Sequence, residues 1–242
     1  MKRGRLLFHQ YIKNKKHKYW IKFYLLTESS GTVLNIQIYT GVCDDIGGKE
    51  HAANVVLCLI ANYSDKSHSY MYNYYNSVTL ARQLLDKNTY CTGTLCAGRK
   101  ETSQEVSKAI LKTGESVQRY GGNVCGGKWK DKREVLYITT EHENNFEEVT
   151  SRSGKRKMKP TPIAQYNKYM SGIDLQDQML SYYPTHRKTI RWYKKVCMRH
   201  IFFHSLNFFI AKYSIITNFF TTIVKNKQFF GMQYQGYLSN FP

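Results

Sequence analysis

The sequence has 242 residues, of which 42% are hydrophobic and 14% aromatic, so it can bury a sizeable core and is not a disordered chain. Lysine and arginine number 36 against 17 acidic residues, which gives a formal net charge of +19. This excess of positive charge predicts a polyanionic partner, nucleic acid in the first place and an anionic membrane surface as the alternative.

The cysteines indicate a reducing compartment. They lie at scattered spacings without a CxxC pair, which predicts reduced, mostly buried thiols in an intracellular protein rather than a disulfide framework or a zinc module. The six are Cys43, Cys58, Cys91, Cys96, Cys125 and Cys197. Residues 1–20 are basic but have no apolar core or cleavage site, so we expect no signal peptide.

The first third of the chain predicts an α/β layer built on an antiparallel meander. Residues 8–11, 19–26 and 33–39 have strand-like patterns, with a basic turn at 13–17. Strands are then expected at 68–71 and 90–95, and helices at 49–61 and 78–85. Alternation of strands and helices after an opening meander is typical of an α/β fold.

The segment from 97 to 162 changes character. A short helix is expected at 105–112, and two strand-like runs at 121–138 surround a glycine-rich turn. The string GNVCGGK at 122–128 has the spacing of a phosphate-binding loop, but Trp129 stands where Ser or Thr should bind magnesium, and strand-like sequence follows it. Residues 150–162, TSRSGKRKMKPTP, predict a mobile basic linker and a nuclear-import signal.

The stretch from 166 to 195 carries the candidate chemistry. Asp174 and Asp177 lie three residues apart, so on a helix they share one face. Basic residues interleaved with aromatic ones follow them, a combination suited to metal-assisted chemistry on a phosphate backbone. The alternative is a charged helix start followed by a solvated basic face. Asp44 and Asp45 could also bind metal at a strand end, although paired acids in a loop are commonly just solvated.

The end of the chain is apolar. Residues 191–220 predict one long or broken helix, and 225–242 show no clear periodicity. Polar side chains interrupt the apolar run at 201–224, which predicts a buried helix rather than a membrane span. These side chains belong to His204, Asn207, Lys212 and Asn218.

Six strings in order resemble the piggyBac transposase family and its domesticated derivatives. They are RGRL at 3–6, YIKNKKHKYWIKFY at 11–24, IYTG at 38–41, NYYNSVTLARQLLDKNTYCTGTL at 73–95, KWKDKREVLYITT at 128–140 and YNKYMSGIDLQDQMLSYY at 166–183. The resemblance implies an α/β fold with an RNase H-like catalytic core, incomplete at its N-terminus and carrying a β-rich insertion. It divides the chain into core residues 1–96, an insertion and basic linker at 97–161, core residues 162–224 and a tail at 225–242.

Enzymes of that family cut and join DNA at TTAA sites with three aspartates that hold two Mg²⁺ ions. By the resemblance, the first aspartate belongs upstream of RGRL, where this chain lacks it, and Tyr72 occupies the second position. The third falls on Asp174, and a neighbouring family acid on Asp177. A phenol keeps its proton at neutral pH and is bulkier than a carboxylate, so we expect no productive Mg²⁺ binding and no DNA cleavage.

DNA binding depends on the cationic surface more than on a metal site, so it is expected to survive. The candidate DNA-binding residues are Lys13, Lys15, Lys16, Lys18, Arg187, Lys188, Arg191 and Arg199. Trp192 is expected to pack within a helix rather than against DNA. The family's C-terminal cysteine-rich module has no counterpart after Tyr213, so recognition of transposon ends should be lost. The resemblance implies a nuclear protein whose partner is DNA and which does not bind a membrane. It also allows a homodimer.

Two alternatives stay open at this point. The chain could be one fragment of an active transposase, whose missing front supplies an aspartate. It could also be a decayed reading frame that has no selected role. The folded chain would then have an exposed sheet edge.

Overall fold

The computed structural model describes the backbone of residues 10–11, 19–39, 48, 50–63, 67–143, 145–150, 154–182, 192–220 and 229–239. The chain divides into two compact units. Unit 1 comprises residues 1–59, 171–226 and 233–242, and unit 2 comprises 60–170 and 227–232. The division inferred from the family resemblance, into two core segments and an insertion, stays a prediction.

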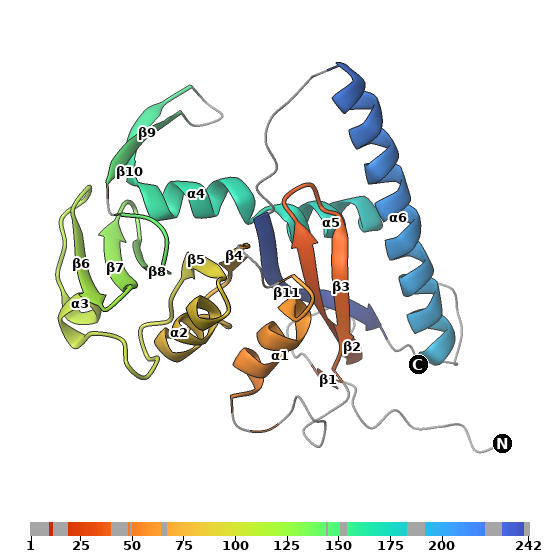
Figure 1. Ribbon diagram of the computed structural model, residues 1–242, viewed down its shortest axis with the longest axis horizontal. Helices are drawn as coiled ribbons and strands as arrows, with labels where there is room; N and C mark the ends of the chain where they lie inside the picture. Colours follow the sequence, from red (N-terminus) through yellow and green to blue (C-terminus); the bar gives the residue numbers. More distant parts are fainter. Residues whose placement is uncertain are drawn as a thin grey trace. The chain divides into compact units, whose positions relative to one another are not determined.

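Unit 1 is built on the predicted meander (Figure 1). Strand β2 (Tyr19–Glu28) pairs antiparallel with β1 (Gln10–Tyr11) and with β3 (Val33–Ile38). Gly31, at a φ of +92°, makes the β2–β3 turn, which few other residues could adopt without strain. Helices α1 (His51–Ile60), α5 (Gly172–Ser181) and α6 (Trp192–Phe220) complete the unit, with Ile60 at its boundary.

Strand β2 is buried on both faces. Its alternate residues Ile21, Phe23 and Leu25 form one core with Ile173 of α5 and Phe203 of α6. Tyr24, on the opposite face, contacts His51 at the start of α1. Two-sided burial explains why this strand has a nearly continuous apolar sequence rather than a clean alternation.

Helix α6 packs on β3 through a mixture of apolar and amide contacts. Asn207 accepts a hydrogen bond from the Val33 backbone N–H at 2.8 Å and donates one to the Val33 carbonyl at 2.6 Å. The amide thereby satisfies two backbone groups of β3, as a neighbouring strand would. Among the described residues, no helix is long and apolar enough to cross a membrane.

Unit 2 is a mixed sheet in the order β11-β4-β5-β8-β7-β6. Strands β4 (His68–Met71) and β5 (Tyr90–Thr94) are parallel and are joined by α2 (Val78–Asp86), as the sequence predicts. Residues Phe229–Met232 of β11 (Phe229–Ser239) pair parallel with β4. Strands β8 (Glu134–Thr139), β7 (Val124–Lys130) and β6 (Ser116–Gly121) follow β5 in antiparallel order.

Three smaller elements complete unit 2. They are α3 (Gln104–Lys108), the separate hairpin of β9 (Phe146–Thr150) and β10 (Arg156–Pro160), and α4 (Thr161–Tyr169). The hairpin corrects the prediction of a mobile basic linker, because residues 156–160 form a strand paired with β9. The intrinsic strand propensity of this basic segment is low, so the sequence does not predict a strand. Pairing with the acidic strand FEEVT stabilises the strand instead.

The structure bears on two further sequence interpretations, those of the glycine-rich string and of the cysteines. The string at 122–128 forms the turn and strand β7 of a hairpin, with no helix after it, so the structure excludes a phosphate-binding loop there. The five described cysteines are free thiols, but only Cys91 and Cys125 are buried, while Cys96 and Cys197 are exposed. Scattered spacing alone could not show which thiols face the core.

Candidate catalytic and nucleic-acid-binding sites

Tyr72 directly follows β4, at the carboxyl end of the parallel β4–β5 pair. In open α/β sheets, this end of the strands is where ligands and catalytic groups gather. The Tyr72 side chain is 43% exposed. The family resemblance assigns the second aspartate position to Tyr72, and this assignment stays a prediction; the structure places the phenol directly after a strand.

The turn after Tyr72 is held by a buried amide. Asn76 donates hydrogen bonds to the carbonyl oxygens of Met71 and Thr94, each at 2.8 Å. The Tyr75 N–H closes the turn on the Tyr72 carbonyl at 3.0 Å. Gly93 lies so close to the Met71 carbonyl and the Asn76 amide that a methyl group there would overlap both. The backbone that presents residue 72 is therefore rigidly built.

Asp174 and Asp177 lie on α5 in unit 1 and differ in their surroundings. Asp174 is exposed in the first turn, while Asp177 is partly buried, with its carboxylate 3.7 Å from the Arg199 guanidinium of α6. Burial lowers the pKa of Arg199, and the Asp177 carboxylate partly offsets this effect. The Arg199 guanidinium also lies over the Phe203 ring at 5.2 Å. Asp177 thus joins α5 to α6.

Side chains that could bind a metal ion do not cluster among the described residues. Within the described ranges, no group of three or more His, Cys, Asp or Glu side chains could hold a metal ion. Mg²⁺ prefers carboxylate oxygens, and the second position offers a phenol instead. Asp44 and Asp45 lie outside the described residues.

Most of the predicted DNA-binding cations also lie outside the described residues. These are Lys13, Lys15, Lys16, Lys18, Arg187, Lys188 and Arg191, and the Trp192 side chain is likewise outside the described part of the structure. Arg199 is described, but its side chain is only 14% exposed and is engaged by Asp177 and Phe203. The role of all eight cations in binding DNA stays a prediction.

Unit 1 contains a buried cation that the sequence analysis missed. Lys22, 5% exposed on β2, places its ammonium 4.4 Å from the Tyr24 ring centroid and 5.4 Å from that of Tyr39. His51 contacts both rings, and its Nε2 lies 2.6 Å from the Tyr24 hydroxyl. Burial lowers the pKa of Lys22 to about 8. Only the tertiary fold could bring α1 onto this face of the meander.

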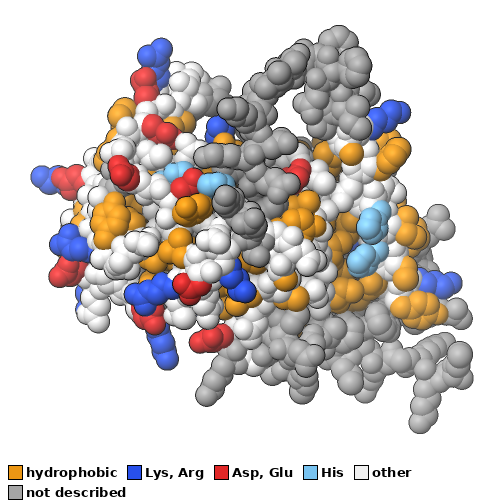
Figure 2. Space-filling view, viewed as in Figure 1, with side chains coloured by type: hydrophobic (Ala, Val, Ile, Leu, Met, Phe, Trp, Pro, Cys, Tyr) orange, Lys and Arg blue, Asp and Glu red, His pale blue; other side chains and the backbone are white. Residues whose placement is uncertain are grey.

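Helix α6 also has an outward apolar side. Ile201, Phe208 and Phe209 are each more than half exposed, and His204 lies among them in sequence. Figure 2 shows apolar and histidine side chains together over this helix. Its other side, with Val196, belongs to the core of unit 1. The two apolar sides explain why its sequence lacks a clear amphipathic pattern.

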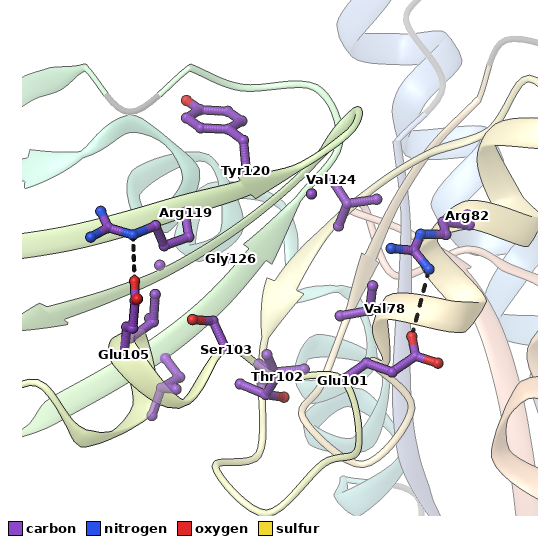
Figure 3. A pocket seen from close by; sticks show the side chains of 15 residues that line it. Val78, Arg82, Glu101, Thr102, Ser103, Glu105, Arg119, Tyr120, Val124 and Gly126 are labelled. Atoms are coloured by element: carbon purple, nitrogen blue, oxygen red, sulfur yellow. Dashed lines mark hydrogen bonds and ion pairs between the residues drawn. The ribbon is translucent and has the colours of Figure 1, made fainter.

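Unit 2 contains two cavities that sequence reasoning did not anticipate. The first, of about 320 Å³, lies among α2, α3 and strands β6 and β7. Figure 3 shows an ion pair on each side of it, Arg82–Glu101 at 3.8 Å and Arg119–Glu105 at 2.8 Å. Each arginine is paired with a carboxylate. These arginines therefore provide no unpaired positive charge that could bind an anion in this cavity.

The second cavity, of about 460 Å³, is bounded by the end of β5, the β7–β8 hairpin, β10 and α4. Trp129, Tyr137 and Ile163 form an apolar cluster beside it, and Lys132, Arg133 and Lys159 line it as well. The nearest signal in the sequence is the string KWKDKREVLY, where a tryptophan lies close to a basic turn. The string alone does not predict the cavity, because β10 and α4, which form the rest of its lining, come later in the chain.

The chain is similar to a family model and to a solved structure. The family model described as Transposase IS4 matches residues 1–207. A solved chain titled as a cryo-EM structure of a piggyBac transposase synaptic complex with hairpin DNA superposes with a TM-score of 0.77 at 24% identity. The match covers 93% of this chain and 47% of that one, so the chain spans about half the length of its structural relative. The structural match confirms the predicted α/β, RNase H-like fold.

Proposed function

The chain belongs to the piggyBac-type transposase family, within Transposase IS4, and on this premise we propose that it is a transposase-derived protein that binds DNA without cutting it. The observation that carries the loss of cleavage is Tyr72. A phenol stands at the carboxyl end of a parallel strand pair, where the family resemblance places a metal-binding aspartate. A phenol has one oxygen on a bulky ring and does not supply the two-oxygen geometry of a carboxylate ligand to Mg²⁺.

Members of such families generally use a divalent metal to activate the attacking oxygen and stabilise the leaving oxygen. In this chain Asp174 is the surviving candidate ligand, and the exposed position of its side chain allows it to contact an ion. A phenol in the second position removes one of the carboxylates on which a two-ion centre depends. We therefore assign no chemical step to these residues.

DNA as partner is supported by two independent features. The chain carries a net charge of +19, and its structural relative was solved with hairpin DNA. In unit 2, Lys132 and Arg133 are exposed on the β7–β8 turn, beside the half-buried Lys159 of β10. Cations of this kind neutralise phosphates and release counterions, which gives affinity without sequence specificity. A nuclear location and a homodimer are part of the same proposal.

Fluorescence anisotropy with a labelled duplex across a salt series tests DNA binding. A protein that makes about six to ten phosphate contacts should lose roughly 10³- to 10⁵-fold in affinity between 50 and 200 mM salt. Absence of binding at low salt would refute the proposed partner.

A plasmid-nicking assay with Mg²⁺ tests the loss of cleavage. We expect no nicking by the wild type and none by Asp174→Asn, which serves as the background control. Mg²⁺-dependent nicking that appears in the wild type and disappears in Asp174→Asn would show an active enzyme and overturn the proposal.

A further inference from the structure

The second cavity of unit 2 combines uncompensated cations with an aromatic lining. Lys132 and Arg133 lie on the β7–β8 turn and Lys159 on β10, and all three line the cavity. None of the three side chains has a carboxylate within ion-pair distance among the described residues. Asp131 also lines the cavity, but its carboxylate is held by Lys157 at 3.0 Å. The remaining charge at this site is therefore positive.

Two polar groups in the lining lack a partner. The indole Nε1 of Trp129, whose side chain is only 5% exposed, and the Thr94 hydroxyl are buried without a hydrogen-bond partner in the described part of the chain. A buried donor left unpaired costs free energy, so such groups often mark a place where a ligand or water supplies the bond. Tyr166 of α4 adds a half-buried aromatic ring to the same lining.

The shape and the charge together favour one class of ligand. A cavity of about 460 Å³ is large enough for a nucleotide, within the range typical of small-molecule sites. Aromatic rings stack on any nucleobase, because every base has a π-face, while lysine and arginine hold the phosphate. The first cavity has no such character, since both of its arginines are paired with glutamates.

We propose that this cavity binds an unpaired nucleotide of single-stranded DNA, with the base against Trp129 and Tyr166 and the phosphate on Lys132, Arg133 and Lys159. The inference rests on the proposed DNA binding and adds to it a defined site and a preference for an unpaired base. A duplex keeps its bases stacked and can reach only the cations at the mouth of the cavity.

The test compares two labelled single strands of about 12 nucleotides, within the range bound by single-strand modules. One is oligo-dT, and the other is an abasic strand with the same phosphates and no bases. Stacking of one base is expected to make the wild type bind oligo-dT about tenfold more tightly than the abasic strand. The double variant Arg133→Gln/Lys159→Gln should lose most affinity for both strands and reduce this preference to less than about twofold.

A matched control removes the same charge elsewhere in unit 2. Lys100 and Lys112 are exposed and do not line the cavity, so Lys100→Gln/Lys112→Gln should keep the tenfold preference. Thermal unfolding by circular dichroism establishes that both double variants are folded. Trp129→Phe retains the cations and tests the aromatic lining by itself. It should weaken the binding of oligo-dT and leave the affinity for the abasic strand unchanged.

The outcomes separate this inference from the proposed function. Equal affinity for oligo-dT and the abasic strand would refute the nucleotide site, while salt-sensitive duplex binding in the same buffer would leave the proposed function standing. A base preference that survives in Arg133→Gln/Lys159→Gln would place the site elsewhere and overturn the assignment. Failure of every DNA to bind at low salt would refute both.

Discussion

Gly172 begins helix α5 at a close approach to strand β2. A methyl group at this position would overlap the carbonyl oxygen of Glu28 and would lie 2.9 Å from the Thr27 Oγ1. The main obstacle is the backbone carbonyl of Glu28 at the end of β2, which accepts a hydrogen bond from the Gly31 N–H at 3.0 Å, so it cannot move aside as a flexible side chain can. Gly172→Ala should therefore push α5, and with it Asp174, away from the meander.

Two opposing magnitudes decide the result. Alanine is favoured over glycine in a helix interior by about 1 kcal/mol, and by less at the first position. Overpacking against a rigid neighbour costs about 1–3 kcal/mol or more. We expect overpacking to dominate and Gly172→Ala to lower the free energy of unfolding by about 2 kcal/mol.

Urea denaturation followed by circular dichroism measures this change. With a slope of about 3 kcal/mol per molar, a loss of 2 kcal/mol lowers the transition midpoint by roughly 0.7 M. Gly98→Ala is the matched control, since nothing lies within 4 Å of a methyl group at that exposed position. A Gly172→Ala variant as stable as the wild type would refute the close approach of α5 to β2.

Three further predictions concern buried polar groups. Burial lowers the pKa of Lys22 to about 8, so the unfolded chain binds this proton more tightly. The free energy of unfolding should rise with pH between about 8 and 10.5, by at most about 3 kcal/mol, and Lys22→Met should flatten that slope in urea titrations. Lys128 donates to the Ser107 and Ala109 carbonyls at 3.1 and 2.7 Å and lies 2.8 Å from Glu134. Lys128→Met should cost about 2–4 kcal/mol in the same assay, and a loss below 1 kcal/mol would contradict this role. Asn76→Ala should cost about 2–3 kcal/mol by removing two hydrogen bonds to strand carbonyls, one of them buried, and protease cleavage near Tyr72 should become faster than in the wild type.

Local patterns in the sequence predicted most regular elements. Alternation identified the meander, and strand–helix–strand order identified the parallel pair β4–β5, since both depend on residues close together in the chain. The hairpin of β9 and β10 was missed because residues 156–160 are basic, and only their pairing with the acidic β9 makes them a strand. Strand β11 was missed for a similar reason, since residues 229–232 form a strand by pairing with β4, more than 150 residues earlier in the chain.

For the candidate site, the sequence by itself predicts that Tyr72, Asp174 and Asp177 occupy the family's catalytic positions, and this assignment stays a prediction. Residue identity and order suffice for that, because a family motif is a linear pattern. The tertiary structure alone decided that Asp177 engages Arg199, that Asn76 fixes the backbone after Tyr72, and that a basic aromatic cavity forms beside β5. Burial and pairing depend on segments distant in sequence, so basic side chains that look alike in the chain are paired and partly buried in one place and line an open cavity in another.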